Sequence, residues 1–297
     1  MNKLVSERPL IRYGWLRALL FIICCGVWMV IAGAIFVLGL FSGKAGKSNW
    51  QEILNNHLTG MSILFVIVLT ILLIVFRRWV DRKPFISIGL QISGYGREII
   101  SGSMMAVFLL GTICLILKWT DHLKWMDILF DGKDLFLAFG TIALIAFYEE
   151  LVFRGYILNN LMDSFPKWIA LLISTFLFML FHWTNPASFG FFTWINNGLL
   201  GLILGMNYLY TRNLWFSFSF HAGWNYFEGP LFGFPGDLKF QTLLQTEMSG
   251  DDNITGGVNG LQSSFITTAV LILGLLGLYF ILQKKLNPKS PAIPGRI

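Results

Sequence analysis

The chain has 297 residues, of which 55% are hydrophobic and 13% are charged, and its mean hydropathy is +0.66. The charged share is about half of that in soluble domains, so a water-soluble globular fold is excluded. The net charge is +6, but Lys and Arg lie in short stretches between apolar segments, a pattern typical of membrane topology signals that argues against nucleic-acid binding.

Eight apolar segments of the chain have the character of membrane-spanning helices. A bilayer core of ~30 Å requires ~20 apolar residues in a helix, because unpaired backbone groups in lipid are too unfavourable for other open structures. In chain order, the spans are expected near residues 16–41, 59–76, 98–117, 135–158, 167–184, 195–210, 214–228 and 263–283. We therefore expect an all-α, polytopic membrane protein.

The segments between these spans alternate in charge. Segment 77–97 is rich in Arg, whereas segments 118–134 and 229–262 carry several acids. Because Lys and Arg mark cytoplasmic loops, segment 77–97 is expected in the cytoplasm and the other two outside it. Eight spans then place both termini in the cytoplasm. The short loops and the lack of organelle signals favour the plasma membrane of a bacterium as the location of this multi-pass protein.

No internal repeat or separate soluble domain is visible in the sequence. We divide the chain into spans one to three with their loops (1–134), a core of spans four to seven (135–228), and an extracytoplasmic loop, span eight and cytoplasmic tail (229–297). Gly201 and Gly205 form a small-xxx-small pair in the sixth span, which predicts close helix packing.

Charged residues at the end of the fourth span are unexpected in lipid. Glu149, Glu150 and Arg154 follow a long apolar run, where each charge costs ~2.5 to 3.5 kcal/mol even on a lenient scale. On a helix, Glu150 and Arg154 are four residues apart and can pair, whereas Glu149 points ~100° away. Arg154 therefore neutralises one acid and leaves the other available. A salt bridge at a helix end is the structural alternative.

Two further spans contribute polar side chains. His182 ends the fifth span, with Phe178 one helical turn before it, and His221 and Asn225 lie four residues apart in the seventh. A single membrane histidine is more often structural, but polar groups in lipid are stable only when they contact one another or water. We expect the carboxylate, the two imidazoles and the carboxamide to converge on one hydrated pocket.

This set of side chains is sufficient for amide hydrolysis. A carboxylate can act as the base for water, and a histidine can share or relay the proton. Histidine and asparagine can donate hydrogen bonds to a developing oxyanion. The chemistry therefore favours a hydrolase.

The sequence resembles the CAAX prenyl protease and bacteriocin-processing family (CPBP, Abi), a group of intramembrane endopeptidases. Three ordered motifs carry the resemblance over roughly residues 135–228. They are Glu149-Glu150-x-x-x-Arg154, Phe178-x-x-x-His182 and His221-x-x-x-Asn225. Each motif alone is weak, whereas the ordered set on hydrophobic helices is specific.

The resemblance implies roles for the matching residues. Glu149 would be the water-activating base with His182 beside it, and His221 and Asn225 would stabilise the oxyanion. Glu150, Arg154 and Phe178 would support them.

The resemblance also raises the question of a metal, because the family was long described as metalloproteases. Glu149, His182 and His221 could hold zinc with one open position. However, no HExxH motif occurs, and a glutamate that binds zinc is not available as a base. We favour a metal-independent glutamate mechanism without a cofactor and keep zinc as the alternative.

The expected function is hydrolysis of a peptide bond in a membrane-associated peptide or protein, through a cavity that opens toward the cytoplasm. The expected partners are membrane lipids and that substrate, without nucleic acid; the substrate's identity and the oligomeric state stay open. The alternative is a non-proteolytic bacteriocin-immunity or membrane scaffold protein of the same fold. A transporter would explain intramembrane Glu and His as a proton relay, but it predicts internal repeats.

Overall fold

The computed structural model describes residues 8–42, 66–183, 190–235 and 240–286, and most of them are helical. The helices are α1 (Gly14–Ser42), α3 (Gly96–Trp119), α4 (Gly132–Glu150), α5 (Asn159–Leu161), α6 (Lys167–Phe181), α7 (Phe191–Thr211), α8 (Trp215–Tyr226), α9 (Asp252–Thr255) and α10 (Phe265–Leu286). Residues 66–75 are also helical. Short π-helical stretches occupy Phe76–Val80, Leu151–Leu158 and Phe227–Leu231, and 3₁₀ turns occupy Phe85–Ile88 and Gly257–Ser263.

Several of these helices can cross a membrane. Within the described residues, four helical segments are long and apolar enough: Gly14–Ala34, Gly96–Trp119, Gly132–Leu161 and Gly257–Lys284. Lys167–Phe181 is apolar but shorter. The chain is therefore a multi-pass helical membrane protein. Eight spans and cytoplasmic termini stay predictions, and the start of the second expected span, 59–65, lies outside the described residues along with both chain ends.

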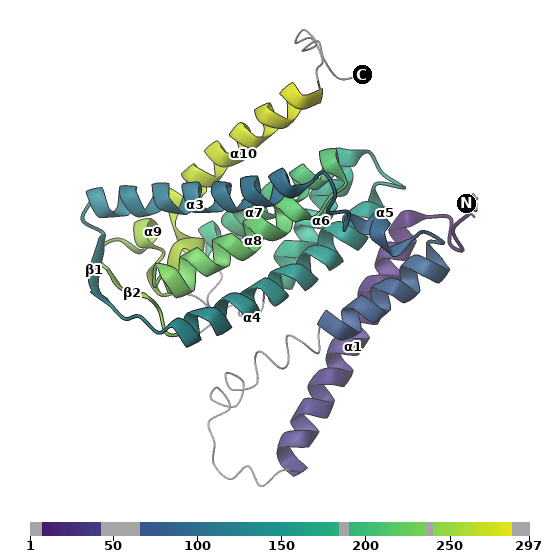
Figure 1. Cartoon of the computed structure of the whole chain (residues 1–297), viewed down its shortest axis with the longest axis horizontal. Coiled ribbons are helices and arrows are strands. Elements are labelled where there is room, and N and C mark those ends of the chain that lie inside the picture. Colours follow the sequence, from purple (N-terminus) through teal and green to yellow (C-terminus); the bar gives the residue numbers. More distant parts are fainter. Residues whose placement is uncertain (1–7, 43–65, 184–189, 236–239, 287–297) are drawn as a thin grey trace.

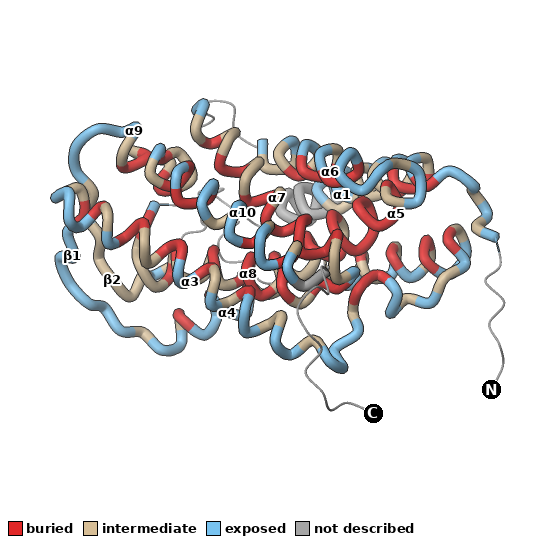
Figure 2. The backbone as a smooth tube through the Cα atoms, turned by 90° about the horizontal axis from the view of Figure 1, so that it is seen from above, coloured by how far each residue is buried: buried red, intermediate tan, exposed pale blue. Residues whose placement is uncertain are grey.

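Helix α8 lies at the centre of the bundle and packs against α3, α4 and α7 (Figure 1). Its contact with α3 is close, because Gly102 leaves no room for a Cβ beside the Ser219 side chain and the Phe216 backbone. Buried residues concentrate along these inner helices, whereas outer faces and loops are exposed (Figure 2). The bundle therefore buries α8, which carries His221 and Asn225.

Helices α6 and α7 pack equally closely. A Cβ at Gly201 would lie 3.0 Å from Thr175 Cγ2, and a Cβ at Gly205 would collide with the Leu171 side chain. The prediction of close helix packing from the Gly201 and Gly205 spacing is confirmed.

The fold is mostly helical rather than strictly all-α, because it contains a two-stranded antiparallel sheet. Strand β1 (Leu123–Ile128) pairs with β2 (Leu244–Met248), with an irregularity between Trp125 and Asp127. Both strands come from the acidic segments expected outside the membrane, where backbone groups need not be satisfied within a helix. The sheet brings these two segments to the same end of the bundle (Figure 1).

A group of buried charges, here called the Asp81 cluster, joins the first helices to the core. It consists of Arg17, Arg77, Asp81, Tyr156 and Asn160. Asp81 accepts hydrogen bonds from Arg17 Nη1 at 3.0 Å and Arg77 Nη1 at 2.8 Å. It also accepts from the Tyr156 hydroxyl at 3.3 Å and Asn160 Nδ2 at 3.4 Å. Asp81 and both arginines are at most 2% exposed, so the cluster fastens α1 and the turn after residues 66–75 to the bundle.

Asp163 extends this cluster toward the surface. Its Oδ2 lies 2.8 Å from Arg17 Nη2 and 3.0 Å from Lys83 Nζ. Partial burial raises the pKa of the Asp163 carboxyl, but the hydrogen bonds and positive charges of Lys83 and Arg17 outweigh this effect and hold the pKa below its usual value. The ionised carboxylate therefore stabilises this end of the fold.

Candidate active site

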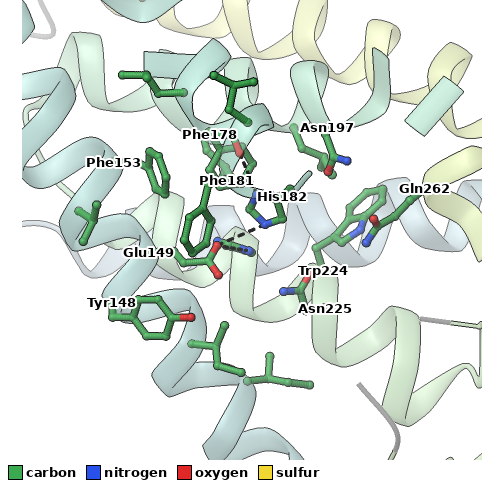
Figure 3. A pocket seen from close by; sticks show the side chains of 18 of the residues that line it. Tyr148, Glu149, Phe153, Phe178, Phe181, His182, Asn197, Trp224, Asn225 and Gln262 are labelled. Carbon is green, nitrogen blue, oxygen red and sulfur yellow. Dashed lines mark hydrogen bonds and ion pairs between the residues drawn. The ribbon is translucent and has the colours of Figure 1, made fainter. Parts of the chain in front are cut away.

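The two glutamates of the first motif end α4, just before the π-helical stretch Leu151–Leu158. Glu150 Oε1 lies 2.8 Å from Arg154 Nη1, in the pairing that their spacing predicted. Glu149 points elsewhere, into a cavity (Figure 3). Both acids are buried, with exposed fractions of 5% for Glu149 and 0% for Glu150. One carboxylate is thus neutralised, and the other faces the cavity.

His182 caps the carboxyl end of α6 beside Glu149. Its Nδ1 lies 2.9 Å from the Phe178 carbonyl oxygen, and because a carbonyl only accepts, Nδ1 carries the hydrogen. Its Nε2 lies 3.5 Å from Glu149 Oε2, and Figure 3 shows the ring directed at that carboxylate. In the neutral ring, Nε2 therefore presents a lone pair toward Glu149.

His221 approaches Glu149 from α8. Its Nδ1 lies 2.9 Å from Glu150 Oε1, and its Nε2 lies 3.8 Å from Glu149 Oε2. A carboxylate acceptor at Nδ1 fixes the hydrogen there, as for His182. Both imidazoles consequently present Nε2 to the same oxygen of Glu149. Three helices, α4, α6 and α8, contribute to this arrangement.

Arg154 and Phe178 support the two histidines. Arg154 is 1% exposed, donates to Glu150 and to the Gly201 carbonyl oxygen at 3.3 Å, and places its guanidinium 4.3 Å from the Phe178 ring centre. The Phe178 ring in turn lies 4.2 Å from the His182 ring. Arg154 therefore holds Glu150, and through it His221, while Phe178 packs between Arg154 and His182.

A cavity of about 930 Å³ lies in front of these groups and is lined by Glu149, His182, His221 and Asn225. Among the described residues, no partner is within hydrogen-bonding geometry of Glu149 Oε2, although the two Nε2 atoms lie at ion-pair distance. At 3.5 and 3.8 Å these contacts are too long for hydrogen bonds. Glu149 therefore keeps hydrogen-bonding capacity for a water or a substrate.

The cavity extends further than the sequence indicated. Its lining includes Phe234, Pro235 and Asn259, which lie near the sheet, since β2 residue Thr246 bonds to the Phe232 carbonyl. The expected opening of the cavity toward the cytoplasm stays a prediction.

The metal-free mechanism stays a prediction, with zinc on Glu149, His182 and His221 as its alternative. In the part of the chain that the structure describes, no group of three or more His, Cys, Asp or Glu side chains is arranged to hold a metal ion. A zinc-bound Glu149 would lose its function as a base, and a chelator distinguishes the two alternatives by experiment.

Sequence reasoning missed several polar residues that line the same cavity: Asn197, Trp224, Glu228 and Gln262. The position of Glu228 could have been predicted from helical spacing, because Glu228 follows Asn225 by three residues and His221 by seven and so lies on the same face. Asn197 is a polar residue within the expected sixth span, so its polarity in an apolar segment also marked it as a candidate. Gln262 lies outside the spans, and its position comes only from the fold.

Comparison with known proteins covers the region that contains all three motifs. Residues 131–227 match the family model "Rce1-like: Type II CAAX prenyl endopeptidase Rce1-like". The comparisons with curated proteins and with solved structures find no match. The family match confirms the resemblance drawn from the motifs, and residues 131–227 of this membrane protein are similar to the proteins that this model describes.

Proposed function

We propose that the protein is an intramembrane endopeptidase that hydrolyses a peptide bond with a water activated by Glu149. The observation that carries this proposal is the environment of Glu149 Oε2. This oxygen is buried, faces two imidazole Nε2 atoms at 3.5 and 3.8 Å, and forms no hydrogen bond within the described residues. A buried acceptor without a donor is unfavourable, and a water in the cavity supplies the missing donor.

The reaction begins when Glu149 takes a proton from this water. The water oxygen forms a bond to the carbonyl carbon of the substrate, and the carbonyl π electrons move onto its oxygen. When the resulting oxyanion collapses, the C–N bond breaks and the amine nitrogen takes the proton from Glu149. His182, whose Nε2 faces the same carboxyl oxygen, shares this proton between the two steps. The products are a carboxyl group and an amine.

His221 and Asn225 stabilise the oxyanion. The Nδ1 hydrogen of His221 is engaged by Glu150, so His221 donates to the substrate from a protonated Nε2. The Glu150 carboxylate contacts both this doubly protonated ring and Arg154, so the three groups together carry one positive charge, which stabilises the oxyanion. The Asn225 carboxamide lines the cavity one helical turn further along α8 and supplies a second donor.

The cavity suits a membrane-associated substrate. Ile22, Met29 and Leu69, from α1 and the helix at residues 66–75, line one part of it. These apolar side chains can contact an apolar segment of a peptide or protein, which leaves the polar groups for the bond to be cut. The membrane of a bacterial cell is the proposed location, without nucleic acid as a partner.

The test uses purified wild-type and Glu149→Ala protein with a library of membrane peptides, with and without a strong chelator. Wild-type protein should cleave peptides in both conditions, and Glu149→Ala should not. Equal cleavage by the two proteins would remove Glu149 from the mechanism. Activity that is lost with the chelator and restored by zinc would replace the metal-free mechanism, and no cleavage at all would favour an immunity or scaffold protein.

A further inference from the structure

Large apolar side chains are exposed along strand β1 and the two residues that follow it. Met126, Ile128 and Phe130 are 64%, 66% and 79% exposed, and Trp125 and Leu129 are exposed as well. Figure 2 shows β1 on the outside of the molecule, in the colour of exposed residues over most of its length. A contiguous apolar surface is unfavourable in water and marks a contact with another protein or with a membrane.

The helices on either side of β1 indicate which of these contacts applies. Helix α3 ends at Trp119, α4 begins at Gly132, and both belong to segments that are long and apolar enough to cross a membrane. Figure 1 shows β1 in the connection from the end of α3 to the start of α4. A short connection between the ends of two membrane spans stays close to the membrane surface.

The exposed apolar surface continues from β1 onto both helices. Phe108 and Leu115 on α3 are exposed, as are Phe136 and Phe139 on α4, and side chains of this kind on a membrane span face lipid. Trp119, at the end of α3, is 90% exposed, and tryptophan is enriched where membrane spans meet the headgroups. The side chains of β1 therefore extend a surface that already contacts the bilayer.

The backbone limits how deeply β1 can lie in the bilayer. Within the described residues, β1 pairs with β2 alone, in a two-stranded sheet. An unpaired strand edge is not tolerated in the hydrocarbon core, because its backbone groups find no partner there. Lys118 Nζ also lies 4.0 Å from the centre of the Trp125 ring, and a lysine of this kind keeps its charge at the polar level of the membrane. The strand therefore fits the headgroup region.

The charge of the surrounding segment favours apolar over electrostatic binding. Residues 118–134 contain three lysines and four aspartates. Attraction to anionic lipids requires a cluster of basic residues, and the charges of this segment nearly cancel. The apolar side chains, rather than the lysines, therefore provide the attraction to the membrane.

We propose that residues 125–130, here called the interfacial segment, insert their apolar side chains into the headgroup region of a phospholipid bilayer. The occupant of this exposed surface is the lipid of the leaflet in which α3 ends. The inference goes beyond the proposed peptidase function and does not depend on it, because it concerns only the position of the segment in the membrane.

The experiment measures the depth of single nitroxide labels by electron paramagnetic resonance, with the full chain in phosphatidylcholine vesicles. The native cysteines are first changed to alanine, and labels are attached at Met126→Cys and Phe130→Cys. Each label is exposed to oxygen, which concentrates in lipid, and to a water-soluble nickel chelate. Reference labels are attached at Phe108→Cys, on the lipid-facing side of α3, and at Asn253→Cys, which is exposed in α9. Thermal unfolding verifies that each labelled protein is folded.

The interfacial segment should lie between the two reference positions in depth. The ratio of oxygen to nickel accessibility at Met126 and Phe130 should exceed that at Asn253 by about tenfold, as for side chains buried at the headgroup boundary, and should be lower than that at Phe108. Vesicles that also contain an anionic lipid should give the same ratios, because the segment has little net charge.

Three outcomes would overturn the proposal. A ratio equal to that at Asn253 would place the segment in water, and a ratio as high as that at Phe108 would place it in the hydrocarbon core. Protection of both labels from oxygen and from nickel would show that a protein, such as a second copy of this chain, covers the surface instead of lipid.

A second set of variants tests whether the apolar side chains cause the insertion. The label is attached at Ile128→Cys, and Met126→Ser and Phe130→Ser are introduced together. The accessibility ratio at residue 128 should then fall by about 3- to 10-fold, toward the value at Asn253. The control Lys124→Ser, at an exposed polar position of the same strand, should leave the ratio unchanged. An unchanged ratio in the double serine variant would refute insertion through these side chains.

Discussion

Two buried groups of charged side chains differ in how completely they are paired. In the Asp81 cluster, the Asp81 carboxylate accepts from four donors and lies among arginines at most 2% exposed. Around Glu149, the distances to the two histidines are 3.5 and 3.8 Å, and the carboxylate faces a cavity. Both groups lie in an apolar bundle, but the Asp81 carboxylate is fully hydrogen-bonded within the protein, whereas Glu149 Oε2 has no hydrogen-bond partner among the described residues and faces the cavity.

The difference separates structural charges from reactive ones. Buried ionic groups are tolerated when partners satisfy them, and the Asp81 carboxylate meets this condition within the protein. The Glu149 site meets it only when a water or a substrate is bound. We therefore expect changes in the first group to affect stability and changes in the second to affect chemistry.

The largest expected effect is on stability, in Asp81→Ala. Two buried arginines lose their partner, so the free energy of unfolding should fall by about 3 to 5 kcal/mol. Thermal unfolding in detergent measures this change. If the variant does not fold, Asp81→Asn, which keeps the shape, provides the smaller measurable loss. A melting temperature unchanged in both variants would show that the cluster is not structural.

Glu150→Gln should have an intermediate effect on both stability and cleavage, because Glu150 pairs with Arg154 and also contacts His221 of the site. The amide still accepts a hydrogen bond but no longer neutralises Arg154 or stabilises a protonated His221, so about 1.5 to 3 kcal/mol of stability should be lost. Cleavage per folded molecule should also fall. Full activity with normal stability would remove Glu150 from both roles.

A smaller loss is expected from Tyr156→Phe, which deletes one of the four hydrogen bonds to Asp81. The remaining three donors keep the carboxylate satisfied, so the loss should be about 0.5 to 1.5 kcal/mol. Cleavage per folded molecule should not change. A fall in activity at constant stability would contradict the view that the Asp81 cluster affects stability and the Glu149 site affects chemistry.

The smallest effect concerns pH. Because the folded-state pKa of Asp163 is held below its usual value, its stabilising contribution is fully present above the unfolded pKa of about 3.9. It is lost as the pH falls through the folded-state pKa. The difference in melting temperature between wild type and Asp163→Asn should therefore be present near neutral pH and vanish in acid. A difference that is the same in acid would refute the assignment.

The sequence predicted those features of the structure that depend on residues close together in the chain. Apolar length predicted the long helices α1, α3 and α10, and the spacing of Glu150 and Arg154 predicted their pairing. The motifs also identified the resemblance that the family model matches over residues 131–227. These features depend on hydropathy and helical periodicity, which are visible within a few turns of chain.

Features that depend on distant pairs could not be predicted in this way. Arg17 has the appearance of a topology charge, and only the fold shows that it binds Asp81, which lies 64 residues away. The sheet joins β1 and β2 across more than a hundred residues, from segments with little strand pattern. Similarly, Trp224 is an ordinary apolar residue until its N–H is found without a partner.

The most direct test of the central claim is Glu149→Gln, measured together with wild type for thermal unfolding and for cleavage per folded molecule. The amide preserves shape but cannot take a proton from water, so cleavage should fall by about 10²- to 10⁴-fold while the melting temperature stays close to that of the wild type. A variant that cleaves at the wild-type rate, or one whose lost activity is explained by unfolding alone, would contradict a catalytic role for the carboxylate that faces the cavity.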